Sequence, residues 1–136
     1  MKKIIYILLT ISLPFLANSC YDRDVIDGKD GVILPTVEGL KSTLSGSDQA
    51  VLSWSIPSSG ISDEIKRPIS VFIQVYKGTT RESYVYLEDE PTTWNLTLKE
   101  PDSKYKVVVK LYGNLKEKSY GKSDEIYSLG QTVEVN

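Results

Sequence analysis

Short runs of alternating apolar and polar residues, separated by turn residues, follow one another from Leu34 to the end of the chain. Successive side chains of a strand point to opposite faces, so each run predicts a strand with one apolar face. Apolar residues at spacings of three and four, which a helix would need, are not sustained anywhere in this region. About seven such strands in roughly a hundred residues predict an all-β fold, a seven-stranded antiparallel sandwich of two sheets.

Large aromatic residues lie on the apolar faces of three predicted strands. In the run AVLSWSIP, Trp54 shares its face with Leu52 and Ile56. Trp94 and Tyr105 share theirs with the aliphatic residues of TWNLTL and KYKVVVKLYG. Because the two sheets of a sandwich pack through these faces, Trp54, Trp94 and Tyr105 are predicted core residues, with Trp54 and Tyr105 on different sheets.

The same alternation turns a second set of aromatic residues outward. When Val71, Ile73 and Val75 point into the core, the residues between them point toward solvent. Antiparallel sheets usually show water a polar face, so aromatic side chains there form a candidate contact face for a protein or a glycan. The alternative is that they are cross-strand pairs that stiffen the sheet, a role for which Tyr and Phe are favoured. The predicted outward set is Phe72, Tyr76, Tyr84, Tyr86 and Tyr112.

The first nineteen residues have the layout of a secretory signal, with a basic start and an apolar run too short to span a bilayer. Small residues, Ala17 and Ser19, stand at −3 and −1 relative to Cys20. The segment FLANSC resembles a bacterial lipobox, which implies that Cys20 receives a diacylglycerol and that residues 1–19 are a lipoprotein signal peptide. The alternative is an ordinary cleavage site that leaves Cys20 as a free N-terminal thiol.

Residues 20–33 are rich in Asp and Gly and poor in apolar side chains, so they predict a flexible acidic tether ahead of a sandwich at 34–136. The spacing of the acids does not fit a calcium loop, because Ile33 stands where the bidentate Glu of an EF-hand would be. Acidic residues directly after a lipidated cysteine resemble the signal that sends some Bacteroidetes lipoproteins to the cell surface.

Histidine is absent from the sequence, and Cys20 is the only cysteine. A Ser–His–Asp triad is therefore excluded, and the usual ligand sets for zinc, copper and iron are missing. Glu88, Asp89 and Glu90 lie together in a predicted turn, where a solvated charge cluster is expected rather than two carboxylates across a substrate cleft. We therefore expect no catalytic residue, no metal and no cofactor, and no enzymatic activity.

The charge of the exported part limits its partners. Without residues 1–19 the chain has 14 basic and 18 acidic residues, a net charge of −4. This balance argues against a nucleic-acid partner. The expected membrane contact is the lipid on Cys20.

Three segments of the chain resemble a fibronectin type III domain between residues 35 and 135. The A–B, C and E–F parts of that family resemble PTVEGLKSTLSGSDQAVLSWSIP, ISVFIQVYKG and LKEPDSKYKVVVKLYG. Trp54 occupies the place of the family's B-strand tryptophan. Pro101 and Tyr105 match the spacing of its Leu-x-Pro-x-x-x-Tyr corner, whereas Leu98 stands one residue too far upstream.

The chain thus resembles small Bacteroidetes-type lipoproteins with a fibronectin type III-like domain. This resemblance implies an exported, lipid-anchored protein of the outer membrane or cell surface. The expected function is a non-catalytic binding module for a protein or a glycan. The alternative is a structural spacer or an accessory subunit of a surface assembly, such as one that handles polysaccharide.

Overall fold

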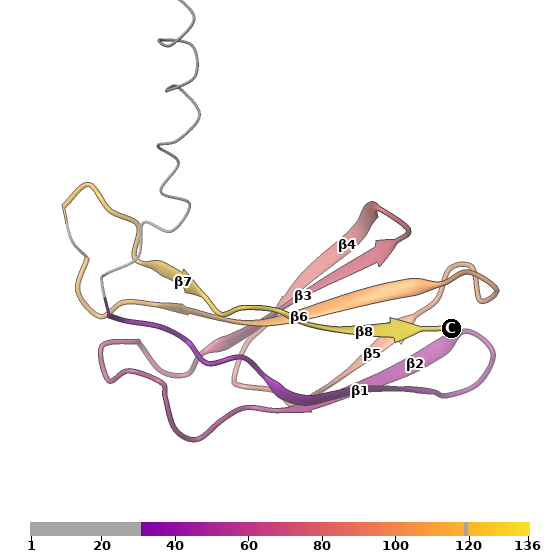
Figure 1. The fold of residues 1–136 in the computed structure, drawn as a ribbon, viewed down its shortest axis with the longest axis horizontal. Coiled ribbons are helices and arrows are strands. Elements are labelled where there is room, and N and C mark those ends of the chain that lie inside the picture. The colour runs from indigo at the N-terminus through magenta and orange to yellow at the C-terminus, as the bar shows by residue number, and fades with distance from the viewer. Residues whose placement is uncertain (1–30, 119) are drawn as a thin grey trace, which may run out of the picture.

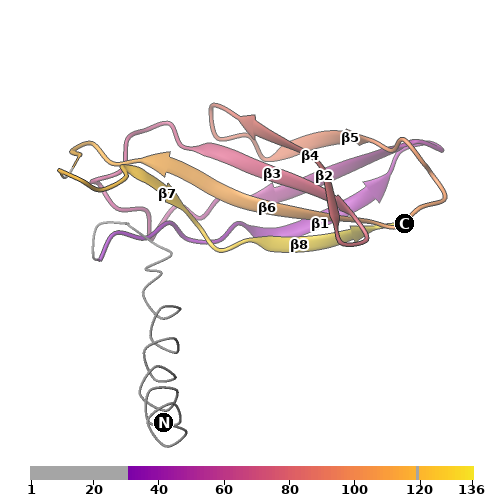
Figure 2. The same ribbon diagram turned by 90° about the horizontal axis from the view of Figure 1, so that it is seen from above.

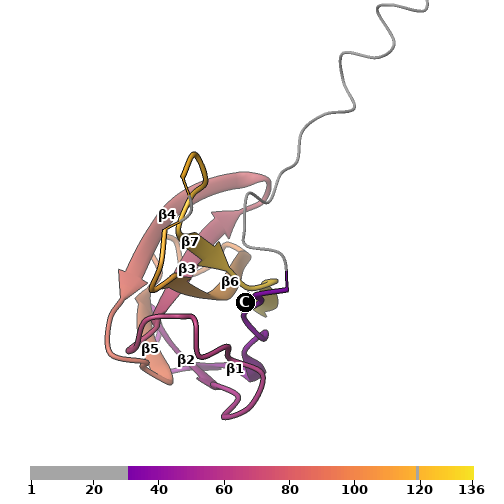
Figure 3. The same ribbon diagram turned by 90° about the vertical axis from the view of Figure 1, so that its left-hand side faces the viewer.

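Two antiparallel sheets face each other in the computed structural model, which describes residues 31–118 and 120–136 (Figures 1 and 3). The smaller sheet has the strand order β1-β2-β5, and the larger has the order β4-β3-β6-β7, with β8 also paired to β6. No helix occurs in the described residues, so the predicted all-β sandwich is confirmed. The strands are β1 (Glu38–Leu44), β2 (Gln49–Ser55), β3 (Ser70–Lys77), β4 (Thr80–Leu87), β5 (Thr93–Thr97), β6 (Tyr105–Asn114), β7 (Glu125–Tyr127) and β8 (Gln131–Val135).

The described residues form eight strands where the sequence predicted seven, because the last one is divided into β7 and β8. Between them, the Ser128 hydroxyl accepts a hydrogen bond from the Leu111 N–H (2.8 Å) and so replaces a backbone partner. Gly130 then passes close to β6, since a Cβ there would lie 2.6 Å from Cγ1 of Val108. A larger residue than glycine would require either this crossing or the side chains of Val108 and Lys110 to shift.

The core lies between the sheets and contains the predicted inward faces of the strands. Trp54 of β2 is 5% exposed, and Tyr105 of β6, on the opposite sheet, is 2% exposed. Trp94 was predicted as a core residue but is only partly buried, because it belongs to β5 at the edge of the smaller sheet. Val32, which the sequence analysis placed in the tether, is buried in the same core.

A hydrogen bond closes the corner before β6. The Tyr105 hydroxyl accepts from the Glu100 N–H at 3.1 Å, and the Ser103 N–H donates to the Glu100 carbonyl at 2.9 Å. The corner therefore forms although Leu98 is displaced by one residue. Leu98 itself is buried in the core.

The first and last described residues lie at opposite ends of the sandwich. The described chain enters at the end that holds β7 and the loop before it, and it leaves at the opposite end (Figure 2).

Within 31–118 and 120–136, the structure has no helix that is long and apolar enough to cross a membrane. The predicted signal peptide, the lipidation site at Cys20 and most of the predicted tether lie outside the described residues.

Candidate interaction surface

The outer face of the larger sheet gathers five aromatic side chains from four strands. Alternation along each strand points them away from the core, and the strand order brings them together. In the ladder, Phe72 of β3 lies opposite Tyr86 of β4, and Tyr112 of β6 lies opposite Tyr127 of β7. We call this group the aromatic cluster; it consists of Phe72, Tyr84, Tyr86, Tyr112 and Tyr127.

The rings of the aromatic cluster contact one another at varied angles. Phe72 and Tyr86 are stacked, with centroids 4.5 Å apart and planes at 23°. Tyr86 meets Tyr84 edge to face at 6.2 Å and 84°, and it meets Tyr112 at 5.2 Å and 66°. Tyr112 and Tyr127 are 4.8 Å apart and tilted by 42°. The surface of the cluster is therefore uneven and does not form a single plane.

Phe72 does not form part of the accessible surface, contrary to its predicted role in a contact face. It lies on the outer side of the sheet, but its neighbours cover it and leave it 8% exposed. The exposed rings are Tyr84 at 59%, Tyr86 at 43% and Tyr127 at 41%. These three tyrosines supply the largest accessible area of the cluster.

Hydrogen bonds occupy the hydroxyl groups of the cluster on the β6–β7 side. The hydroxyls of Tyr86 and Tyr127 are 2.9 Å apart, and the Tyr112 hydroxyl donates to Glu125 Oε1 at 3.1 Å. Burial, and then the bond with Tyr86, raises the pKa of Tyr127. Burial, and then the bond to Glu125, raises the pKa of Tyr112 above its usual 10.0. Both hydroxyls therefore stay neutral at physiological pH.

Tyr76 was predicted to join Phe72 and Tyr112 on this face, but it lies apart from the aromatic cluster. It follows Phe72 by four residues on β3, where the register with β4 shifts between Val75 and Tyr76. Lys106 of β6 lies over its ring, with Nζ 5.4 Å from the centroid. Tyr76 thus marks a basic margin of the face and not its aromatic centre.

Tyr127 is the cluster member that the sequence analysis missed. The sequence EIYSLGQTVEV, residues 125–135, predicts one final strand but does not by itself show which of its residues point inward. Ile126 is buried in the core, so its neighbour Tyr127 points outward. Assigning Ile126 to the core would have revealed Tyr127 from the sequence.

The sequence predicted a solvated charge cluster in the acidic turn after β4. In the structure, only part of this turn is fully exposed to solvent. Glu88 and Asp89 are exposed, but the Glu90 carboxylate accepts hydrogen bonds from the Arg67 guanidinium and from the Ile69 N–H at 3.1 Å. These two bonds, in that order, hold the pKa of Glu90 below its ordinary value of 4.5. Glu90 therefore ties the turn to the segment before β3.

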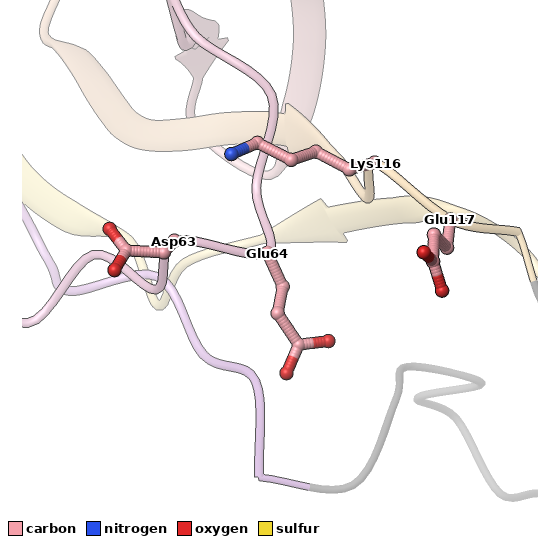
Figure 4. Close-up of a pocket in the computed structure, with 4 residues that line it drawn as sticks. All are labelled: Asp63, Glu64, Lys116 and Glu117. Carbon is pink, nitrogen blue, oxygen red and sulfur yellow. The ribbon is translucent and has the colours of Figure 1, made fainter.

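A hollow between two loops is lined by charged side chains (Figure 4). Its lining residues are Asp63, Glu64, Lys116 and Glu117, and their charged ends point in different directions. Nowhere in the described ranges do three or more His, Cys, Asp or Glu residues gather as metal ligands would. The aromatic cluster is thus the candidate site with the stronger structural basis.

A family model described as "Domain of unknown function (DUF4945)" matches residues 20–135. No curated protein matches the sequence.

Solved structures with a similar fold include fibronectin type III domains. The third fibronectin III domain of human KIAA0343 protein has a TM-score of 0.54 at 16% identity, covering 77% of this chain and 84% of that one. Domains d3-d4 of the rat CD45 extracellular region have a TM-score of 0.56 at 10% identity, covering 76% of this chain. The match spans 49% of the CD45 chain, so this chain corresponds to about half of that structure. At these identities the likeness establishes the fold, which is fibronectin type III-like.

Proposed function

The chain belongs to the family described as "Domain of unknown function (DUF4945)", and we propose that it acts as a non-catalytic interaction module whose aromatic cluster contacts a partner protein. The observation that carries this proposal is the exposure of Tyr84, Tyr86 and Tyr127, at 41–59%, side by side on one sheet face. Tyrosine rings bury a large area with little loss of side-chain freedom, which is why they are common in binding hot spots.

The geometry of the rings favours a protein over a glycan as the partner. A sugar ring stacks best on an open, flat aromatic face, whereas most rings of the cluster are tilted by 42–84° against their neighbours. The hydroxyls of Tyr86, Tyr127 and Tyr112 are also already hydrogen-bonded within the molecule, which leaves fewer groups for sugar hydroxyls. The side chains of a partner protein can fit against such an uneven surface.

The N-terminal sequence supports a proposal for where the module is located. We place the protein outside the cytoplasm, anchored to the outer membrane through a lipid on Cys20 and exposed at the cell surface. The basic start, the short apolar run and the FLANSC segment support this location.

The residues also support a non-catalytic role. The sequence lacks histidine, and the Glu90 carboxylate is engaged by Arg67 and Ile69 rather than directed at a cleft. A fibronectin type III-like sandwich carries its functions on its surface and loops, so the exposed residues specify the role.

A second candidate function is a structural spacer or an accessory subunit of a surface assembly. One observation favours it: the cluster packs largely against itself, so that Phe72 is only 8% exposed. Cross-strand aromatic pairs of this kind stabilise a sheet by about 0.2–1 kcal/mol each, without any ligand.

Site-specific photo-crosslinking of the full-length protein in cells tests the proposal. A photo-reactive phenylalanine analogue at Tyr127 should give an adduct with a partner protein. The same analogue at Tyr120, a fully exposed tyrosine in the loop before β7, is the matched control and should give none. Replacing Tyr84 and Tyr86 with Ser should abolish the Tyr127 adduct.

The outcomes separate the candidates. No adduct at Tyr127, or an equal adduct at Tyr120, contradicts the contact face and favours the spacer. Glycan-array binding that is lost when Tyr84, Tyr86 and Tyr127 are replaced with Ser would instead identify a glycan as the partner and contradict the protein assignment.

A further inference from the structure

The hydroxyls of Tyr86 and Tyr127 meet on the outer face of the larger sheet, 2.9 Å apart, although the two residues are 41 positions apart in the sequence. Tyr86 belongs to β4 and Tyr127 to β7, and β3 and β6 lie between these strands in the sheet. The two side chains therefore reach toward each other over the intervening strands and meet at their hydroxyl ends. This contact joins two strands that are not neighbours in the sheet.

The rings of this pair are held in place by the same two side chains. Tyr86 is stacked on Phe72 at 4.5 Å and meets Tyr112 at 5.2 Å. Tyr127 meets Phe72 at 5.6 Å and Tyr112 at 4.8 Å. Phe72 is itself only 8% exposed, so both rings pack against a well-covered side chain. The contact between the two hydroxyls is thus fixed by the packing of the aromatic cluster.

Both rings are also accessible from solution. Tyr86 is 43% exposed and Tyr127 is 41% exposed, so a reagent in solvent can reach either ring. Exposed side chains move within their rotamer wells on the picosecond to nanosecond scale. The pair therefore combines a fixed mean position with enough freedom for the ring edges to approach each other.

Two phenols in this arrangement are suited to one-electron oxidation. A phenol that loses an electron and its proton becomes a radical whose unpaired electron is shared by the oxygen and by the ring carbons ortho and para to it. In tyrosine the para carbon carries the side chain, so the ortho carbons, Cε1 and Cε2, are free to form a bond. When two such carbons join, the two hydroxyls flank the new bond and lie side by side, as those of Tyr86 and Tyr127 already do.

We propose that Tyr86 and Tyr127 are a site of oxidative cross-linking, at which a bond between a Cε atom of each ring joins β4 to β7 as a dityrosine. The oxidant is a peroxide activated by a haem peroxidase. Each ring gives up one electron and one proton, the two radicals combine, and the hydrogen at each joined carbon moves to the oxygen of its own ring. The two electrons and two protons released reduce one molecule of hydrogen peroxide to two of water.

This chain has a particular use for such a bond. Cys20 is the only cysteine, so a disulfide cannot form within the chain. A cross-link between residues 41 positions apart restricts the unfolded chain and so stabilises the folded one. Compartments outside the cytoplasm are oxidising, and the proposed location of the protein places both phenols there. The inference itself goes beyond the proposed function, since the cross-link needs no partner protein.

Oxidation of the purified full-length chain tests the site. A haem peroxidase with hydrogen peroxide, at low protein concentration, should give a monomer that is lighter by two hydrogen atoms and shows dityrosine fluorescence. Trypsin cleaves after lysine and arginine, so the sequence predicts that peptides 82–99 and 123–136 remain joined. The cross-linked monomer should also unfold at a higher urea concentration than the untreated one.

Conservative variants identify the two rings. Tyr86→Phe and Tyr127→Phe each keep an aromatic ring but remove the phenol, and each should abolish the joined peptides. Tyr84 shares a peptide with Tyr86, so Tyr84→Phe is the matched control and should retain them. Tyr120→Phe, which removes a fully exposed phenol in the loop before β7, should retain them as well.

Oxidation of the wild-type chain in urea shows whether the folded geometry directs the reaction. Unfolding separates residues that are far apart in the sequence, so the yield of joined peptides should fall severalfold. This measurement uses no substitution, and it therefore stays informative if a variant folds poorly. An equal yield from folded and unfolded chains would contradict the inference.

Three further results would overturn the cross-link. Joined peptides 82–99 and 123–136 could persist in Tyr127→Phe. Peptide 111–116, which contains Tyr112, could be joined to 123–136 in place of 82–99. The main product could be a dimer of two chains, or oxidised tyrosines without any joined peptides. Because the purified chain is oxidised without a partner, none of these results depends on the photo-crosslinking that tests the proposed function.

Discussion

The Tyr86 ring lies stacked on Phe72, with centroids 4.5 Å apart, so that Phe72 is 8% exposed while Tyr86 remains 43% exposed. One side chain thus covers an apolar residue on its inner side and presents a surface on its outer side. This dual position means that stability and recognition have to be separated in any test of the aromatic cluster.

Replacing Tyr86 with Ala should destabilise the domain more than replacing Tyr84 with Ala. The first substitution uncovers Phe72 and removes a stacked pair, which costs about 0.5–1.5 kcal/mol beyond the area lost. Tyr84 meets Phe72 only at an edge, with centroids 6.1 Å apart, and is itself 59% exposed. Urea unfolding of both variants measures the difference. Equal losses would mean that the two rings cover Phe72 to the same extent.

Trp54→Ala should lower the free energy of unfolding by about 3–5 kcal/mol, because a large buried ring is lost from the centre of the core. Trp54→Phe should cost clearly less. Within the described part of the chain the indole Nε1 of Trp54 has no hydrogen-bond partner, and Phe removes this buried donor. Trp94→Ala, at a partly buried edge position, is the control and should cost less than Trp54→Ala. A reversed order would contradict the burial described for these two residues.

Tyr105→Phe tests the corner before β6. It removes the acceptor for the Glu100 N–H but keeps the buried ring, so we expect a loss of about 0.5–1.5 kcal/mol in thermal or urea unfolding. Tyr76→Phe removes a hydroxyl on the outer face and should leave the stability nearly unchanged. If both variants unfold alike, the hydrogen bond at the corner contributes nothing measurable.

Acid should destabilise the domain partly through Glu90. Its pKa is lower in the folded protein than the ordinary 4.5, so its contribution is present above pH 4.5 and is lost as the pH falls through the folded value. Glu90→Gln should therefore lower stability at pH 7 and flatten the loss between neutral pH and acid. Glu100, whose pKa is lowered by its bond to Lys77, keeps part of the pH dependence in that variant. The exposed Glu88→Gln serves as the control, and an identical pH profile for all three proteins would rule out the role of Glu90.

Lipidation at Cys20 is testable in cells. A clickable fatty acid should label the wild-type chain and not Cys20→Ser, because the thiol is the only one in the sequence. The unlabelled variant should also leave the membrane fraction. Equal labelling of both chains, or an unmodified Cys20 at the mature N-terminus, would remove the lipid anchor from the proposed location.

Alternation along the chain was sufficient to predict the sandwich and the side of the sheet on which many residues lie. Val71, Ile73 and Val75 are buried, and Tyr84, Tyr86 and Tyr112 are on the outer face, because successive side chains of a strand point in opposite directions. This rule is local, so it needs no knowledge of the neighbouring strands. The corner before β6 was instead predicted from the resemblance of Pro101 and Tyr105 to the fibronectin type III pattern.

Tertiary structure decided how much of each side chain remains accessible. Phe72 is covered because β4 and β7 place Tyr86 and Tyr127 against it, and Trp94 stays partly open because β5 ends its sheet. Both outcomes depend on which strands become neighbours and where each sheet stops. Alternation within one strand carries no information about either, since it specifies the direction of a side chain but not what lies above it.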